Sequence, residues 1–234
     1  MKYLIAIGLL LTAAAVPAAA EPATAQALLA QMKAACGGSA WARVQSWHET
    51  GSVEFPDGRT AENEVWHDMH SLKSAMIGRI DGKIVRRAGF DGTTYWQAGP
   101  DGQVHTGNDL EGLRKQRRDA YLSSFGWFFP DRFPADIQLG ENKALEGETF
   151  QVLKITPQDA DSLELWVDRG THRVRRIVAG KEFADLTEYQ TFDGVCTATR
   201  GMQGDGNPQH EITLLVHTVN TATAAPASTF APPK

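Results

Sequence analysis

Motifs that mark common enzyme classes are absent from this chain of 234 residues. It contains no Gly-x-Ser-x-Gly nucleophile elbow, no phosphate-binding glycine loop and no Gly-x-Gly-x-x-Gly dinucleotide fingerprint. The Asp-Thr-Gly and Asp-Ser-Gly triplets of aspartic proteases are also missing, because Asp91-Gly92-Thr93 has these residue types in another order. No spacing brings two carboxylates together as an acid/base pair. We therefore expect no enzymatic activity, no catalytic residue and no cofactor, with an unrecognised secreted hydrolase as an alternative.

Metal-binding and nucleic-acid-binding patterns are equally scarce. The nearest approach to a zinc motif is His67-Asp68-Met69-His70, but residues three apart on a strand point to opposite faces. We expect these histidines at the surface and no metal site. The formal net charge is −5, and nucleic-acid binding needs a clustered basic face. The basic cluster at 114–118 is short, and we expect it on the solvated face of a helix.

Cysteine is represented by only two residues, Cys36 and Cys196. Two cysteines alone cannot complete a zinc site. In an oxidising compartment they can pair, and the loop of about 160 residues would then contribute roughly 4–5 kcal/mol to stability. Two buried thiols that never meet are the alternative, and the sequence leaves both open.

Long apolar runs are confined to the first twenty residues. Lys2 supplies a positive start, residues 4–11 are apolar, and an alanine-rich stretch with Pro17 follows. The small residues Ala18 and Ala20 fit a signal-peptidase site, which predicts a signal peptide at 1–20, cleaved after about Ala20. No cysteine lies at the cut, and no later stretch is apolar for long enough to span a membrane. We expect an exported, soluble, periplasmic protein with no transmembrane segment in the mature chain.

The mature chain begins with helical spacing and then changes to strand patterns. Residues 21–35 predict a helix that ends at Gly37-Gly38, and a short turn at 39–44 follows with Ser39 as its cap. From 47 to 104, short alternating segments are separated by turn residues, which predicts an antiparallel meander of sandwich or barrel type. The turn signals in this part are Asp57-Gly58, Gly78, Asp81-Gly82, Asp91-Gly92 and Asp101-Gly102.

A helix is predicted to interrupt the strands at 110–124, capped by Asn108 or Asp109. Leu110 and Tyr121 belong to its predicted apolar face, while Arg118 does not. The aromatic and proline-rich loop at 125–134 forms either a core plug or an exposed apolar rim. Strands resume from about 137 to 219, with turn signals at 146–147, 168–170, 180, 193–194 and 204–206. We predict a single domain at 21–220 and an extended tail at 221–234.

Aromatic residues are plentiful, with six tryptophans and ten phenylalanines. Most such side chains in a soluble protein simply pack in the core. A curved antiparallel sheet nevertheless has an inner face that must be covered. If the covering helix is held loosely, this interior becomes a cavity for an apolar ligand. Composition alone leaves both interpretations open.

Several short motifs occur in a characteristic order along most of the mature chain. They are ACGGSAW at 35–41, GFDGTTYW at 89–96, LEGETFQVL at 145–153, LWVDRGTHRVRR at 165–176, YQTFDGV at 189–195, and the ending VN at 219–220 with TFAPP at 229–233. In this order the chain resembles the periplasmic outer-membrane lipoprotein-sorting family, the LolA/LolB-like carriers, and most of all their uncharacterised relatives.

The resemblance implies a mainly β (α+β) fold, an incomplete and strongly curved antiparallel β-barrel with an N-terminal helix and a mid-chain helical lid. It implies a carrier or sensor for an apolar ligand, either a lipid or the acyl chains of a lipoprotein. A cell-envelope scaffold that binds a protein partner and no small ligand is the alternative. We expect a monomer that does not bind nucleic acid.

The lid region and apolar strand positions supply the expected ligand-binding residues. The cavity and lid residues are Trp66, Met76, Trp96, Leu113, Tyr121, Phe125, Trp127, Phe128, Leu165 and Leu214. Arg114 and Arg117 are the candidates for polar contacts of the lid.

Overall fold

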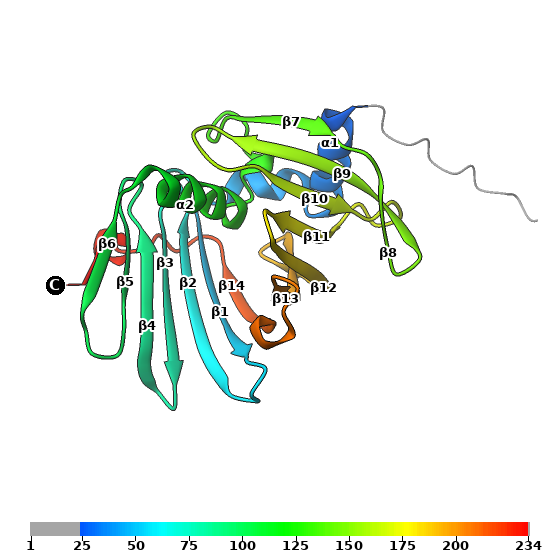
Figure 1. Ribbon diagram of the computed structural model, residues 1–234. Coiled ribbons are helices and arrows are strands. Elements are labelled where there is room, and N and C mark those ends of the chain that lie inside the picture. Colours follow the sequence, from blue (N-terminus) through cyan, green and yellow to red (C-terminus); the bar gives the residue numbers. More distant parts are fainter. Residues whose placement is uncertain (1–23, 234) are drawn as a thin grey trace, which may run out of the picture.

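A computed structural model describes residues 24–233, and the predicted signal peptide at 1–20 lies outside them. Figure 1 shows a curved sheet with helix α2 (Leu110–Ser123) across its hollow side and helix α1 (Ala25–Ala35) at one end. The first meander contains β1 (Ser46–Glu54), β2 (Thr60–Asp68), β3 (Ser74–Ile80), β4 (Lys83–Phe90), β5 (Tyr95–Ala98) and β6 (Val104–Gly107). The strands after α2 are β7 (Ala135–Leu139), β8 (Lys143–Leu145), β9 (Glu148–Pro157), β10 (Leu163–Val167), β11 (Val174–Ala179), β12 (Glu182–Phe192), β13 (Val195–Gly204) and β14 (Ile212–Asn220).

The sheet consists of two antiparallel meanders that meet at β1 and β14. Strands that follow one another in the sequence pair with each other from β1 through β6, and again from β9 through β14. The β1–β14 pair joins the two halves, and β7 and β8 both pair with β9. The end strands β6 and β7 do not pair with each other within the described chain, so the barrel is incomplete. The predicted mainly β half-barrel is confirmed.

Most of the predicted turn residues lie where the strands reverse. Asp81-Gly82 connects β3 to β4 and Asp193-Gly194 connects β12 to β13, in each case with positive φ at both residues. This is the conformation that a tight hairpin needs. Gly78 is an exception, because it lies inside β3 beside a register shift and not in a turn. A glycine within a strand commonly marks such a bulge.

The helices begin close to the predicted positions, with one error in capping. Thr24 accepts a hydrogen bond from the amide of Ala27 and caps α1. Asp109 does the same for α2 through the amide of Gly112. The predicted turn at 39–44 is the 3-10 helix η1 (Gly38–Arg43), and Gly37 precedes it at φ 115°. The predicted Ser39 cap is wrong, since this residue lies inside η1 and makes no cap hydrogen bond.

The face of α2 that packs on the protein also differs from the prediction. Leu110 is 72% exposed, whereas Arg118 is buried. Arg118 can be buried because its guanidinium group donates hydrogen bonds to the acidic side chains of Asp119 and Glu182. The spacing of residues in the sequence does not reveal this pairing. The expectation that the basic cluster at 114–118 is wholly solvated was wrong for this residue.

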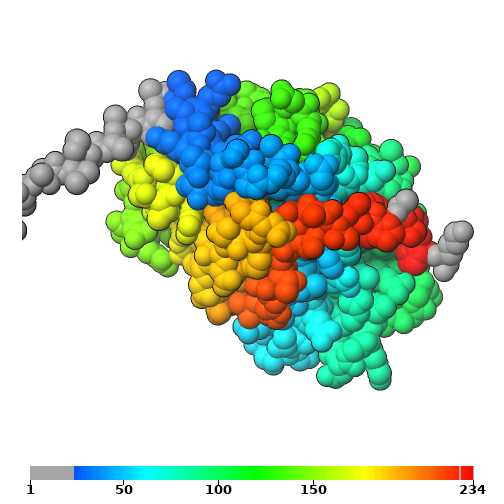
Figure 2. Space-filling view, turned by 180° about the vertical axis from the view of Figure 1, so that it is seen from behind, coloured from blue at the N-terminus to red at the C-terminus, as the bar shows by residue number. Residues whose placement is uncertain are grey.

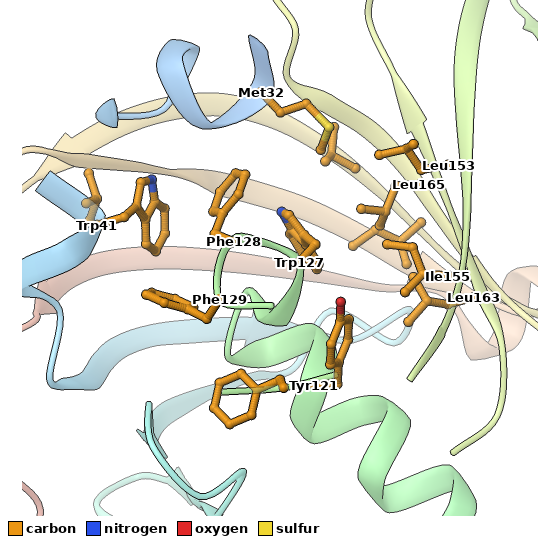
Figure 3. Close-up of a cluster of buried hydrophobic side chains, with 14 of the residues drawn as sticks. Met32, Trp41, Tyr121, Trp127, Phe128, Phe129, Leu153, Ile155, Leu163 and Leu165 are labelled. Atoms are coloured by element: carbon orange, nitrogen blue, oxygen red, sulfur yellow. The ribbon is translucent and has the colours of Figure 1, made fainter. Parts of the chain in front are cut away.

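The main hydrophobic core lies between α1, η1, the segment after α2 and strands β9–β11 (Figure 3). Trp127 and Phe128, in the 3-10 helix η2 (Gly126–Phe128), pack there together with Phe129 and Phe133. Strand residues Leu153, Ile155, Leu163 and Leu165 form the opposite wall. Of the two interpretations of the aromatic loop, the structure selects the core plug.

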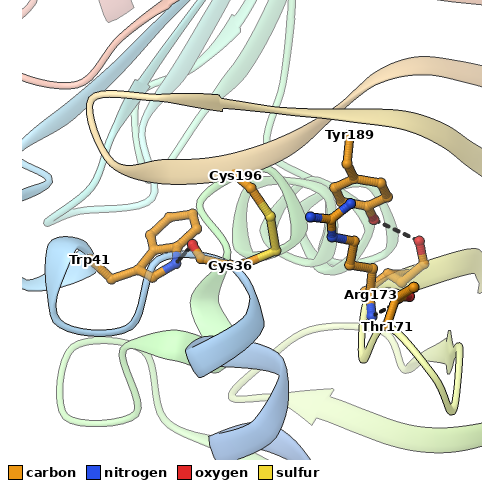
Figure 4. The surroundings of a disulfide bond; sticks show 7 residues. Cys36, Trp41, Thr171, Arg173, Tyr189 and Cys196 are labelled. Carbon is orange, nitrogen blue, oxygen red and sulfur yellow. Dashed lines mark hydrogen bonds between the residues drawn. A yellow bond between two sulfur atoms is a disulfide. The ribbon is translucent and has the colours of Figure 1, made fainter.

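Cys36 and Cys196 form a disulfide that ties the end of α1 to β13 (Figure 4). The carbonyl of Cys36 also accepts hydrogen bonds from the indole of Trp41, at 2.7 Å, and from the amide of Cys196, at 3.1 Å. The pairing that the sequence left open is therefore present. It closes a sequence separation of 160 residues.

The C-terminal segment folds back along the outer side of the sheet and forms the 3-10 helix η4 (Ala227–Phe230). Figure 2 shows this end of the chain running over the back of the molecule. The carbonyl of Phe230 accepts a 2.9 Å hydrogen bond from the indole of Trp96 on β5. The segment predicted as an extended tail thus contains a packed turn. The short 3-10 helix η3 (Pro208–His210) lies in the β13–β14 connection.

Candidate functional site

A cavity of about 800 Å³ lies between α2 and the inner face of the sheet. This volume is within the range of about 300–1,000 Å³ that is usual for small-molecule sites. Its walls come from α2, the loop after α2, β1, β2, β4 and β11–β14. The apolar lining residues are Trp47, Val65, Leu122, Phe125, Trp127, Val174, Ile177, Ala179, Phe183, Ala184, Leu186, Ala198, Ile212, Leu214 and Val216.

Polar side chains enter the same cavity from the first two strands. Trp47 and Glu49 of β1, and Asn63, Val65 and His67 of β2, all line it. The alternation follows from the pleat of a strand, in which every second residue points to one face. The register places Trp47 opposite His67 and Glu49 opposite Val65, so these side chains form one continuous inner surface.

Burial shifts the pKa of two of these groups. It lowers the pKa of His67 to about 4, so the imidazole is neutral at neutral pH. It raises the pKa of the Glu49 carboxyl, and a hydrogen bond of 3.0 Å from the Trp47 indole opposes this shift. Both effects have the same cause, since a low-dielectric surrounding disfavours the charged form. His67 was expected at the surface and is instead only 8% exposed.

An ionic cluster holds the middle of α2 against the edge of the cavity. Arg118 donates to Glu182 at 3.1 Å and to its neighbour Asp119 at 2.7 Å. Lys115 donates to the other oxygen of Glu182 at 2.8 Å. Hydrogen bonds to Lys115 and Arg118 lower the pKa of the Glu182 carboxyl, which favours its charged form. We call these four residues, Lys115, Arg118, Asp119 and Glu182, the helix clamp.

Further contacts attach α2 to other parts of the sheet. Arg114 donates to the Asp161 carboxylate at 2.9 Å, and Arg117 reaches the carbonyl of Asp159 at 3.4 Å. At the start of the helix the hydroxyl of Tyr95 donates to Asp109. Arg114 and Arg117, the predicted polar contacts of the lid, therefore both bind the β9–β10 connection. All of these contacts are polar and partly exposed, in contrast to the apolar core beside them.

The structure separates the ten predicted ligand-binding residues into three groups. Phe125, Trp127 and Leu214 line the cavity. Tyr121, Phe128 and Leu165 lie in the packed core, outside the cavity lining. The four others, Trp66, Met76, Trp96 and Leu113, do not line the cavity either.

The reasons differ among these four residues. Trp66 lies between Val65 and His67, which face inward, so it points to the outer face, where its ring stacks on His48 at 3.6 Å. Trp96 packs beneath the C-terminal segment. Met76 is opposite Val65 and shares its face without reaching the cavity, and Leu113 lies half-buried on α2.

Sequence reasoning missed the polar side of the cavity altogether. Glu49, Asn63 and His67 alternate along β1 and β2 with outward residues, and this alternation was the available signal. A strand face cannot be assigned without the register, because a slip of one residue exchanges inside for outside. The clamp residues Arg118 and Glu182 are 64 positions apart, so no local pattern connects them.

Two classes of site are not found within residues 24–233. No group of three or more His, Cys, Asp or Glu side chains there could hold a metal ion. No helix in the same range is long and apolar enough to cross a membrane.

Comparison with known proteins finds similarity in structure. No protein-family model matches the sequence, and no curated protein matches it. A LolA superfamily protein from Nitrosomonas europaea aligns over 90% of this chain and 98% of its own, with 16% identity and a TM-score of 0.59. An outer membrane lipoprotein-sorting protein domain from Vibrio parahaemolyticus aligns over 89% and 96%, with 11% identity and a TM-score of 0.58.

A DUF1329 family protein from Desulfovibrio piger aligns over 88% of this chain and 96% of its own, at 12% identity and a TM-score of 0.56. These alignments extend over nearly the whole described chain, and their identities are too low to transfer an activity. The half-barrel described above is therefore the fold of LolA superfamily and lipoprotein-sorting proteins, as the sequence resemblance predicted.

Proposed function

We propose that the protein is a periplasmic carrier or sensor that holds an apolar ligand, a lipid or the acyl chain of a lipoprotein, in the cavity beneath α2. The observation that carries the proposal is the cavity of about 800 Å³, most of whose wall on β11–β14 is aliphatic or aromatic. Burying one methylene group there contributes roughly 0.8 kcal/mol, so a partly buried chain binds with useful but reversible affinity.

The arrangement of α2 supports exchange of such a ligand. The helix is held over the cavity by the helix clamp and by Arg114 and Arg117, and each of these contacts includes a partly exposed partner. Exposed ion pairs contribute about 0–1 kcal/mol each. Breaking these contacts can free α2 as far as Arg118, while Tyr121 near its end stays packed in the hydrophobic core. Structural similarity to a LolA superfamily protein and to a lipoprotein-sorting domain agrees with a carrier.

Binding of a fluorescent fatty acid to the purified protein tests this proposal. We expect saturable binding, and displacement by an unlabelled single-chain lipid. The variant Ala184→Phe places a ring in the cavity and should weaken binding by about tenfold or more, equivalent to about 1.4 kcal/mol. Ala144→Phe on the exposed strand β8 is the control and should leave the affinity unchanged.

Two results would overturn the proposal. One is the absence of uptake of any acyl probe by the folded protein. The other is equal binding by Ala184→Phe and the unmodified protein, which would place the probe outside the cavity. Extraction of the purified protein followed by mass spectrometry provides an independent measurement, since a carrier is expected to retain acyl lipid from the envelope.

A further inference from the structure

We infer that the β1–β2 side of the cavity is a headgroup site, which accepts the uncharged, hydroxyl-bearing headgroup of a single-chain lipid such as a monoacylglycerol. This inference rests on the proposed function, because it assumes that an acyl chain enters the cavity. Beyond the proposed function, the inference specifies that the headgroup of the ligand is polar and uncharged, and at which end of the cavity this headgroup lies. The headgroup site consists of Glu49, Asn63, His67 and Trp127.

Unpaired polar atoms in the cavity wall are the first observation. His67 Nδ1, Asn63 Oδ1 and Trp127 Nε1 are buried, and none of them has a hydrogen-bond partner in the described part of the chain. His67 is 8% exposed and Trp127 is 5% exposed. All three residues line the cavity. A buried polar atom without a partner costs about 1–3 kcal/mol, and such atoms are rare in native proteins. A ligand that supplies the missing partners would remove this cost.

Strand register gathers these groups at one place. Trp47 is opposite His67, Glu49 is opposite Val65, and Gly51 is opposite Asn63. Side chains on one face of an antiparallel pair lie about 4.5–5.5 Å apart when directly opposite and about 7–8 Å apart on the diagonal. Glu49 is thus a diagonal neighbour of both His67 and Asn63. One small headgroup can reach more than one of them.

Aromatic contacts connect the fourth member to this surface. The ring centroids of Trp47 and Phe125 are 4.9 Å apart, and those of Phe125 and Trp127 are 5.7 Å apart. Phe125 is therefore a bridge from β1 to the segment after α2, and it lines the cavity as well. Trp127 therefore joins the headgroup site from η2, the segment after α2, and its indole N–H can only donate a hydrogen bond.

The charges of the headgroup site favour a neutral ligand. Glu49 is its one acidic group, and His67 is neutral at neutral pH because burial lowers its pKa to about 4. Two of the cations that line the cavity, Lys115 and Arg118, are already paired with Glu182. The third, Arg86, is an exposed residue of β4. A carboxylate or phosphate headgroup would therefore enter a low-dielectric site beside Glu49 without a buried cation to compensate it.

A hydroxyl group matches the available atoms better. It can donate to Asn63 Oδ1 or to Glu49, and it can accept from the indole of Trp127. His67 Nδ1 can serve as donor or acceptor, according to its tautomer. From this end the apolar wall of Ile177, Leu186, Leu214 and Val216 offers a path for the acyl chain.

Quenching of tryptophan fluorescence by brominated lipids tests the inference, because Trp47 and Trp127 are in the cavity wall. The two probes are brominated stearoyl glycerol and brominated stearate, which share a chain and differ in headgroup charge at neutral pH. We expect the glycerol ester to bind about tenfold more tightly or better, which corresponds to about 1.4 kcal/mol. Equal affinity, or tighter binding of stearate, would overturn the headgroup site and leave the carrier proposal standing.

The variants Asn63→Leu and His67→Leu replace the hydrogen-bonding side chain by an apolar one of similar size. Each should reduce the preference for the glycerol ester to about threefold or less, while stearate affinity stays the same or rises. Gln203→Leu, a polar lining residue on β13, is the matched control and should keep the full preference. A full preference in both β2 variants would contradict the inference. Quenching by neither lipid would contradict the carrier proposal itself.

Discussion

Arg118 of α2 donates a hydrogen bond of 3.1 Å to Glu182 at the beginning of β12, and only 7% of the Arg118 side chain is exposed. The helix thus contributes a buried cation to the rim of the cavity, where Lys115 binds the same carboxylate. Removing one member of a buried pair is costly when the other stays buried. Here the acidic partners Glu182 and Asp119 are roughly half exposed, so water can solvate them.

Arg118→Met should therefore loosen α2 without unfolding the protein. Methionine retains much of the apolar stem and loses the hydrogen bonds to Glu182 and Asp119. We expect amide hydrogen exchange of α2 to become about tenfold faster, equivalent to about 1.4 kcal/mol of local stability, while the core strands β9–β11 keep their protection. The control is Arg59→Met, which breaks an exposed ion pair with Asp57 far from α2. Unchanged exchange of α2 would show that the helix clamp does not hold it.

Removal of the disulfide should strongly destabilise the protein. The bond between Cys36 and Cys196 closes a loop of 160 residues, for which chain entropy predicts about 4–5 kcal/mol. We expect the double variant Cys36→Ala/Cys196→Ala, and the reduced unmodified protein, to unfold at clearly lower urea concentrations. The reduced protein loses only the bond, whereas the variant also loses the sulfur atoms. Equal urea midpoints for the two samples would therefore assign the destabilisation to loss of the bond. A midpoint equal to that of the oxidised protein would contradict the expected contribution.

Mild acid should destabilise the protein through His67. Its pKa is about 4 in the folded state and close to 6.5 when unfolded, so the unfolded chain binds an additional proton between these values. The free energy of unfolding therefore decreases as the pH falls through this window, and at about pH 5 it is lower by about 2 kcal/mol than at neutral pH. Urea unfolding at both pH values should show this loss, and His67→Leu should lack it. Burial raises the pKa of the nearby Glu49, which gives the opposite pH dependence, so only the difference between the two proteins is informative.

The buried Tyr121 and the half-buried Tyr189 should respond differently to loss of the hydroxyl group. The Tyr121 hydroxyl is buried and has no hydrogen-bond partner among residues 24–233, whereas that of Tyr189 donates to the carbonyl of Val174 at 2.6 Å. Tyr121→Phe should leave the free energy of unfolding unchanged or raise it by about 1 kcal/mol. Tyr189→Phe should lower it by about 1 kcal/mol. A clear loss of stability in Tyr121→Phe would reveal a partner for its hydroxyl group.

The amino-acid sequence by itself determined the features that depend on neighbouring residues. Asp81-Gly82 and Asp193-Gly194 specify hairpins because their backbone conformations are local, and Asp109 begins α2 because its carboxylate accepts a hydrogen bond from the amide of Gly112. The spacing of the turns predicted an antiparallel meander, in which each strand pairs with its neighbour in sequence, and the resemblance of the motif order to LolA/LolB-like carriers added the half-barrel.

Tertiary structure alone decided the features that depend on register and on distant partners. Trp66 and Trp47 look alike in the sequence, yet the pairing of β1 with β2 turns one outward and the other into the cavity. Arg118 is buried because Glu182 lies beside it in space, and Cys36 pairs with Cys196 because η1 packs against β13. Side chains along a strand alternate between its two faces, but the alternation does not show which face is enclosed. Which residues line the cavity is therefore decided only by the register and curvature of the sheet beneath α2.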